Sequence, residues 1–107
     1  MSTFRGTDQY KEAIHRAVLE SRGLDAYTGW RLDWEKISTF DNAQAETGRR
    51  NYMKKYARLP TVDHVDDGRS GQNFKICSWI VNDCKSHLSL DEFKEVCRAV
   101  LNYSKTN

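Results

Sequence analysis

The sequence contains few of the features that mark fibrous, disordered or membrane proteins. One proline and six glycines in 107 residues exclude collagen-like and low-complexity chains. No long hydrophobic run is present: the longest mostly apolar stretch covers residues 76–81, and Ser78 interrupts it. We therefore expect no membrane span and no signal-peptide core. The first five residues have no targeting character, so we expect a cytoplasmic protein.

Neither sign of charge dominates, and cysteine is scarce. The chain has 17 basic and 15 acidic residues, a net charge of +2, which is too balanced to indicate nucleic-acid binding by itself. The three cysteines are Cys77, Cys84 and Cys97. Their number is odd and their spacing matches no zinc knuckle, so we expect buried thiols in a reducing compartment, with Cys97 in the core. Twelve aromatic residues (3 Trp, 5 Tyr and 4 Phe) can fill the core of one small domain spanning 1–107.

The first part of the chain, 1–60, is expected to be mainly helical. The spacing of apolar residues predicts a helix over 8–21, with Thr7 as its N-cap and Gly23 just after its end. The buried face of this helix is expected to carry Tyr10, Ile14, Ala17 and Val18. Thr28-Gly29 predicts a turn between two short extended pieces. Four bulky residues around this turn are expected to pack in the core: Tyr27, Trp30, Leu32 and Trp34.

A second helix is expected over about 41–58, because Asp41 and Gln44 form a capping-box pair and Pro60 ends it. Its second half carries five cations and no acid: Arg49, Arg50, Lys54, Lys55 and Arg58. A solvated helix face is one interpretation of this segment. Because the total charge is balanced, the segment is also the best candidate for a surface that contacts phosphates.

The remaining patterns predict a hairpin followed by helices, and hence an α+β fold. Strands are expected over 61–65 and 73–79, with Phe74, Ile76 and Cys77 facing inward, and a short helix over about 82–87. Ser89 and Glu92 form a capping box for a last helix in 89–107. The apolar stripe of this last helix is expected to be structural and consists of Leu90, Phe93, Val96, Cys97, Val100 and Leu101.

Chemistry-bearing residues are concentrated in the expected hairpin and short helix. Neighbouring side chains on an ideal strand point to opposite faces, so Asp63 and His64 need a strand end or a bulge to serve one site. The carboxylate of Asp63 and the amide oxygen of Asn82 are hard oxygen ligands that suit Mg²⁺ or Mn²⁺, with waters and a phosphate completing the shell. The imidazole of His64 could take a proton from water near neutral pH.

The segment 62–86, a quarter of the chain, resembles the HNH, or ββα-metal (His-Me finger), endonucleases. The resemblance rests on Val62-Asp63-His64-Val65, on Asn73-Phe74-Lys75-Ile76-Cys77 and on Asn82-Asp83-Cys84-Lys85. The upstream Tyr27-Thr28-Gly29 is similar to a turn often found ahead of such cores. The resemblance implies a ββα-metal core over 61–88, between the helical part and the last helix.

The resemblance also implies roles for single residues. His64 would be the general base, Asp63 and Asn82 would hold one divalent metal, and Asn73 would help to orient His64. Lys85 would lie near phosphate. Asn73 follows His64 by only nine residues, fewer than in the usual family loop, so a simple turn role is its alternative. Asn82 could instead be a helix N-cap, and His87, Asp66 and Asp67 are further ligand candidates.

These observations lead to a metal-dependent endonuclease as the first hypothesis. It would hydrolyse DNA with one Mg²⁺ or Mn²⁺ ion, as a monomer or homodimer, with RNA not excluded and no membrane partner. The nucleic-acid contacts would come from Lys85, Arg49, Arg50, Lys54, Lys55, Arg58 and Arg69. One alternative is a non-catalytic module that binds nucleic acid or protein on a similar scaffold. Another is a structural subunit of a larger assembly.

Overall fold

The computed structural model describes residues 2–39, 53–65 and 73–106. They form the helix α1 (Ser2–Ser21), the 3-10 helix η1 (Trp34–Thr39), the strands β1 (Pro60–His64) and β2 (Phe74–Ser78), and the helices α4 (Trp79–Lys85) and α5 (Leu90–Thr106). The coarse α+β class predicted from the sequence is confirmed. None of the helices in these residues combines the length and the apolar character that crossing a bilayer requires.

The two strands pair as an antiparallel hairpin. The register runs from Pro60 opposite Ser78 to His64 opposite Phe74. Beyond the last pair, the Val65 N–H donates to the Asn73 carbonyl at 3.0 Å, which extends the pairing by one step. The strand expected over 73–79 therefore ends earlier, because Trp79 already belongs to α4.

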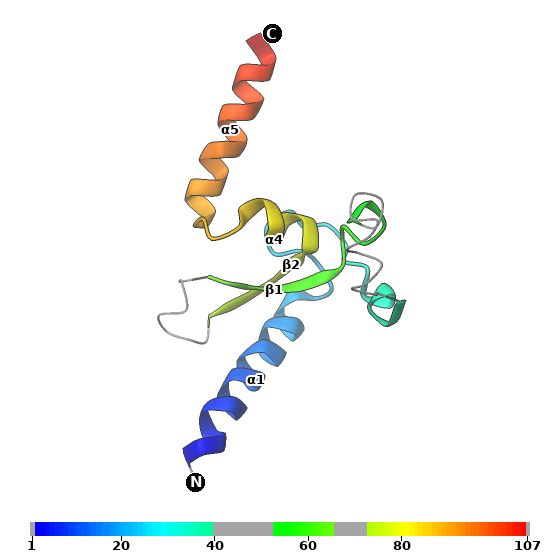
Figure 1. Ribbon diagram of the computed structural model, residues 1–107, viewed down its shortest axis with the longest axis vertical. Coiled ribbons are helices and arrows are strands. Elements are labelled where there is room, and N and C mark those ends of the chain that lie inside the picture. The colour runs from blue at the N-terminus through cyan, green and yellow to red at the C-terminus, as the bar shows by residue number, and fades with distance from the viewer. Residues whose placement is uncertain (1, 40–52, 66–72, 107) are drawn as a thin grey trace.

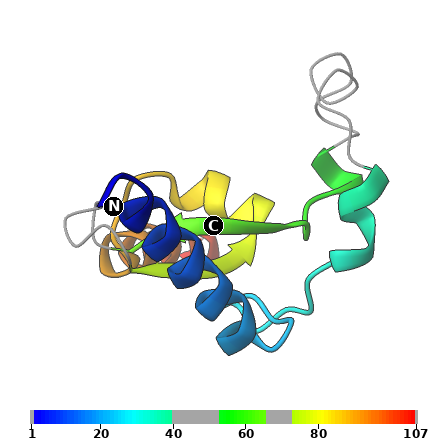
Figure 2. The same ribbon diagram turned by 90° about the horizontal axis from the view of Figure 1, so that it is seen from below.

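The hairpin lies between α1 and α4, and its main core is on the α1 side (Figures 1 and 2). The buried residues of this core are Ala13, Ala17, Leu32, Phe74 and Ile76. The small alanines allow α1 to lie close to β2, and Ile14, Val18, Trp34 and Val62 pack around them. The expected inward residues of β2 are confirmed, since Phe74, Ile76 and Cys77 are all buried.

Helix α1 begins at Ser2, so Thr7 lies inside it and is not the N-cap expected from the sequence. The helix ends at a pair of left-handed residues, Arg22 with a φ of 53° and Gly23 with a φ of 82°. Its expected apolar face is only partly covered, because Tyr10 at the edge of the hairpin is 41% exposed.

The segment after α1 turns as expected at Thr28-Gly29, and Leu24 and Arg31 form an isolated bridge on either side of it. Leu32 is fully buried, but Trp30 was wrongly expected in the core: it is exposed, with the Arg58 guanidinium 4.4 Å from its ring. The 3-10 helix η1 that follows was not expected. Most of the helix expected over 41–58 lies outside the described residues; 53–55 are helical and 56–58 form a turn.

Helix α4 follows β2 without a loop, because Ser78 ends the strand and caps the helix. The Ser78 hydroxyl accepts a hydrogen bond from the Val81 N–H at 3.3 Å. The short helix expected from Asn82 thus begins three residues earlier. Since Ser78 is the N-cap, the alternative role of Asn82 as a cap is wrong.

Helix α5 begins with the expected capping box. The Ser89 N–H donates to Glu92 at 2.9 Å, and the Glu92 N–H donates to the Ser89 hydroxyl at 3.1 Å. The apolar stripe of α5 was expected to be structural, but Val96, Val100 and Leu101 are at least 50% exposed. The expected burial of Cys97 in the core is wrong, as is that of Cys84, since both thiols are exposed. The physical reason for the exposure along α5 is the direction of the helix, which leaves the hairpin on the side opposite α1 (Figure 1).

Candidate active site

A cleft of about 560 Å³ lies where the end of β1 meets α4 and the start of α5. Its walls come from residues 62–65 of β1 and its turn, from Asn82 and Lys85 of α4, and from 86–89 and Glu92. We call it the Asp63 cleft. It brings together three residues that sequence reasoning singled out for chemistry, Asp63, His64 and Asn82.

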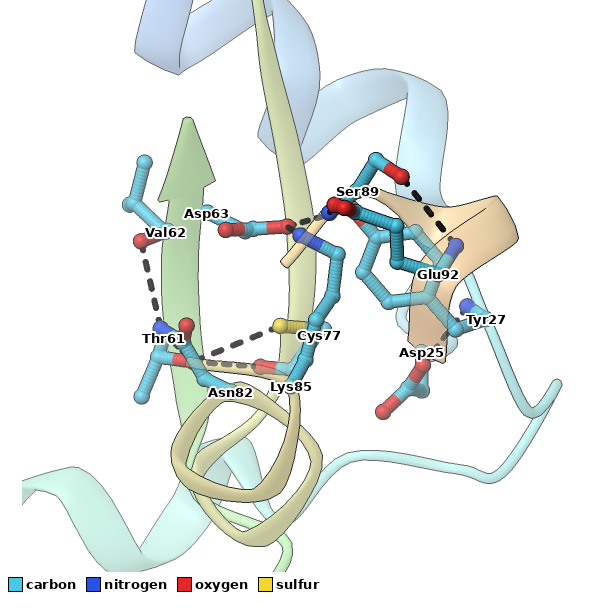
Figure 3. Close-up of polar contacts among 10 residues, drawn as sticks. All are labelled: Asp25, Tyr27, Thr61, Val62, Asp63, Cys77, Asn82, Lys85, Ser89 and Glu92. Atoms are coloured by element: carbon cyan, nitrogen blue, oxygen red, sulfur yellow. Dashed lines mark hydrogen bonds and ion pairs between the residues drawn. The ribbon is translucent and has the colours of Figure 1, made fainter. Parts of the chain in front are cut away.

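Asp63 is a buried carboxylate, 5% exposed, whose two oxygens have different surroundings. One oxygen, Oδ2, accepts the Tyr27 hydroxyl at 2.5 Å and lies 3.1 Å from the Lys85 ammonium (Figure 3). Within the described residues, the other oxygen, Oδ1, has no hydrogen-bond partner. The carboxylate is therefore held in one orientation and keeps one oxygen for a further ligand.

Tyr27 reaches Asp63 because its own loop is fixed by a second buried carboxylate, that of Asp25. One oxygen of Asp25 accepts the backbone N–H groups of Tyr27 and Thr28, and the other accepts the N–H of Ser78. The loop is thereby tied to the junction of β2 and α4. Burial, together with the hydrogen bond to Asp63, raises the pKa of Tyr27 above its usual value, so Tyr27 remains a donor.

Asn82 lies three residues before Lys85 on α4, and its amide is anchored to β1. The Asn82 Nδ2 donates to the Thr61 hydroxyl at 3.2 Å and to the Val62 carbonyl at 3.3 Å. Both contacts use the amide nitrogen. The amide oxygen has no hydrogen-bond partner in the described part of the chain and belongs to a side chain that lines the cleft.

His64 lies at the end of β1, on the opposite face of the strand from Asp63, as strand geometry predicts. Its Nε2 is 2.9 Å from the Tyr10 hydroxyl, and its ring packs edge-on against Phe74 with the centroids 4.9 Å apart. The imidazole is exposed at the rim of the cleft. When Nε2–H donates to Tyr10, the Nδ1 lone pair is available to accept a proton.

Lys85 was expected near phosphate, but in the structure it is 3% exposed and paired with Asp63. Of the expected basic surface, Lys54, Lys55 and Arg58 are exposed, and they precede β1. They therefore lie at the opposite end of this strand from His64. Arg49, Arg50 and Arg69 lie outside the described residues.

Asn73 is exposed, and the contact it supplies to the end of β1 comes from its backbone carbonyl. The position of the His64 ring depends instead on Phe74 and Tyr10. His87 lines the other wall of the cleft, where its Nδ1 is 3.2 Å from the Ser86 hydroxyl. Asp66 and Asp67, the remaining ligand candidates, lie outside the described residues.

The donor set of the cleft fits a hard divalent cation that keeps much of its water. The strand β1 and the helix α4 supply two unbonded oxygens, Oδ1 of Asp63 and the amide oxygen of Asn82, and Mg²⁺ is commonly held by one or two protein oxygens plus waters and phosphate. Residues 2–39, 53–65 and 73–106 contain no group of three His, Cys, Asp or Glu side chains placed to hold a metal.

Three features of this site could not be found by sequence reasoning. They are the contact of Tyr10 with His64, the hydrogen bonds of Asp25 that fix the Tyr27 loop, and the burial of Lys85. Only the Tyr27-Thr28-Gly29 pattern gave a signal, without showing which side chain Tyr27 meets. Comparison of the chain with protein-family models, with curated proteins and with solved structures finds no match.

Proposed function

We propose that the protein is a metal-dependent endonuclease that hydrolyses phosphodiester bonds, with DNA as the favoured substrate. The observation that carries this proposal is the lining of one cleft by Asp63, His64 and Asn82 on a strand–strand–helix unit. A nuclease of this kind needs oxygens for a cation, a base for water and room for a phosphate, and this cleft offers all three.

In the proposed mechanism, Asp63 and Asn82 would hold Mg²⁺ or Mn²⁺. When bound, the cation would stabilise the negative charge that develops on the phosphate and the leaving oxygen. His64 accepts a proton from the attacking water through Nδ1, while Tyr10 holds Nε2. Tyr27 keeps the Asp63 carboxylate oriented throughout, because its hydroxyl stays protonated.

The exposed cations Lys54, Lys55 and Arg58 support a nucleic-acid substrate. They lie on one segment, and the Arg58 guanidinium covers the exposed ring of Trp30. Such cations contact phosphates along a strand and make binding sensitive to salt. These cations precede β1, whereas the Asp63 cleft lies at the end of β1. A bound duplex would therefore have to extend along β1 to contact both the cations and the cleft.

The test is nicking of supercoiled plasmid, with single-stranded DNA and RNA as parallel substrates. We expect cleavage with Mg²⁺ or Mn²⁺, none with a chelator, and a loss of about 10²-fold or more in His64→Ala. The matched control is His15→Ala, since His15 is exposed on α1 and does not line the cleft. Absence of metal-dependent cleavage of all three substrates would overturn the proposal.

A second candidate is a module that binds nucleic acid without cleaving it. The observation that favours it is the buried Lys85, which already neutralises the only carboxylate of β1. Salt-dependent DNA binding that persists in His64→Ala, with no turnover by the unmodified protein, would support this candidate over the nuclease.

A further inference from the structure

The ion pair of Lys85 and Asp63 is buried at the bottom of the candidate metal site. The ammonium and the carboxylate are 3.1 Å apart, and the two residues are 3% and 5% exposed. Taking two charges out of water is costly, so each charge depends on its partner. Since a buried ion pair is often no more stabilising than apolar residues of similar volume, stability alone does not account for this pair.

The surroundings of Lys85 show how its position is maintained. The Tyr27 ring centroid is 5.7 Å from the ammonium, and the Tyr27 hydroxyl donates to the same Asp63 oxygen that Lys85 contacts. Within the described residues Asp63 is the only carboxylate that pairs with Lys85, and no other acceptor contacts its ammonium. The buried position of the Lys85 ammonium therefore depends on the negative charge of the Asp63 carboxylate.

A divalent cation on Asp63 would change this balance. The cation would approach the free Oδ1, a few ångströms from an ammonium of the same sign, and like charges at that separation in a partly buried site repel each other strongly. Withdrawal of carboxylate charge toward the cation would also leave Lys85 without a full counter-charge. Lys85 is among the residues that line the cleft, so the cleft is the space into which a displaced side chain would turn.

We propose that Lys85 is the resident counter-ion of Asp63, which a divalent cation displaces into the cleft, toward the place of a substrate phosphate. This inference rests on the proposed function, since it assumes that Asp63 binds the cation. Lys85 is then a positioning residue in the metal-free protein and competes with the metal for one carboxylate. In the metal-free protein the ammonium of Lys85 balances the charge of Asp63, so metal binding carries the cost of displacing it.

The test compares Mn²⁺ affinity, measured by electron paramagnetic resonance, in the unmodified protein, in Lys85→Met and in Lys85→Arg. Methionine keeps the length of the side chain without its charge. We expect Lys85→Met to bind Mn²⁺ at least about tenfold more tightly, and Mn²⁺ to raise its Tm more than that of the unmodified protein. Lys85→Arg should not gain affinity. Lys94→Met, which removes an exposed lysine of α5, is the matched control.

The outcomes separate this inference from the proposed function. Equal Mn²⁺ affinity in the unmodified protein and in Lys85→Met would overturn the inference and leave the metal site standing. No binding of Mn²⁺ to any of the proteins would overturn both. A loss of affinity in Lys85→Met would show that Lys85 supports the metal rather than competing with it, and would overturn the inference.

A second measurement does not depend on whether Lys85→Met folds. In the unmodified protein, the side-chain ε-CH₂ resonance of Lys85 can be identified by its absence from the spectrum of Lys85→Arg. We expect this resonance to shift during a Mg²⁺ titration toward the position of an exposed lysine. Movement of the backbone resonances of Asp63 and Asn82 with an unchanged Lys85 resonance would contradict displacement.

Discussion

Among the described residues, Asp25 and Asp63 are the two buried carboxylates, and their hydrogen-bond partners give them different roles. Asp25 accepts three backbone N–H groups, from Tyr27, Thr28 and Ser78, and both of its oxygens are used. Asp63 is held by side chains and keeps one oxygen free. A carboxylate bonded entirely to backbone is a structural element, whereas one with spare capacity next to a cleft is suited to bind a ligand.

The role of Asp25 leads to a stability prediction. Asp25→Asn removes the charge that strengthens three hydrogen bonds, and its amide nitrogen would face an N–H donor. We expect the free energy of unfolding, measured by urea titration, to fall by about 2–4 kcal/mol. Asp33→Asn is the matched control, because Asp33 forms a partly exposed pair with Lys36, and it should change stability by less than about 1 kcal/mol. Equal effects would contradict this account of Asp25.

Cys77 gives a second prediction at this scale. Burial raises the pKa of the Cys77 thiol to about 11. The unfolded chain therefore loses this proton at lower pH than the folded protein, and the stability that Cys77 contributes is lost as pH rises from about 9 toward 11. We expect urea midpoints at pH 8, 9 and 10 to fall less steeply in Cys77→Ala than in the unmodified protein. Parallel curves would show that Cys77 does not titrate in this way.

At the scale of elements, local sequence signals predicted the hairpin and the start of α5. Both signals are local: one is the alternation of apolar residues around Phe74 and Ile76, and the other is the capping box of Ser89 and Glu92. Because each involves only a few neighbouring residues, the sequence is enough to predict these elements. The start of α4 was missed because Ser78 serves both as strand end and as N-cap. A strand that passes directly into a helix leaves no loop composition to mark the boundary.

The exposure of the α5 stripe could not be predicted from periodicity. An apolar face at helical spacing shows that a helix is amphipathic, but whether the chain turns back to cover that face depends on tertiary structure. Here the helix continues away from the hairpin, and with α1 pointing the other way the molecule is 61 Å long. Val100 and Cys97 therefore remain on the surface.

Two separate substitutions test the difference in burial between β2 and α5. Ile76→Ala removes a side chain that is 2% exposed and should lower the free energy of unfolding by about 2–5 kcal/mol, because a cavity remains. Val100→Ala removes a side chain that is 59% exposed and should change it by less than about 1 kcal/mol. Urea unfolding of both variants checks the prediction. A large loss in Val100→Ala would show that α5 is packed in solution.

At the scale of the whole molecule, the sequence predicted which residues line the candidate site, but it did not predict which distant side chains contact Asp63 and His64. The order of Asp63, His64 and Asn82 along a hairpin and helix is a local property, and the structure places all three at one cleft. The contacts of Tyr10 with His64 and of Tyr27 with Asp63 join residues 54 and 36 positions apart. No spacing rule connects such residues, so only the fold reveals them.

The most direct test of the account is a Mn²⁺ titration of isotope-labelled protein followed by amide NMR signals. The central claim is that Asp63 and Asn82 together bind a divalent cation, and paramagnetic Mn²⁺ broadens the signals of nearby residues most. We predict that the first signals to disappear are those around 62–64 and 82–85, and that Asp63→Asn removes this selectivity. Broadening centred instead on the exposed acids of α5, Asp91 and Glu95, would contradict the claim.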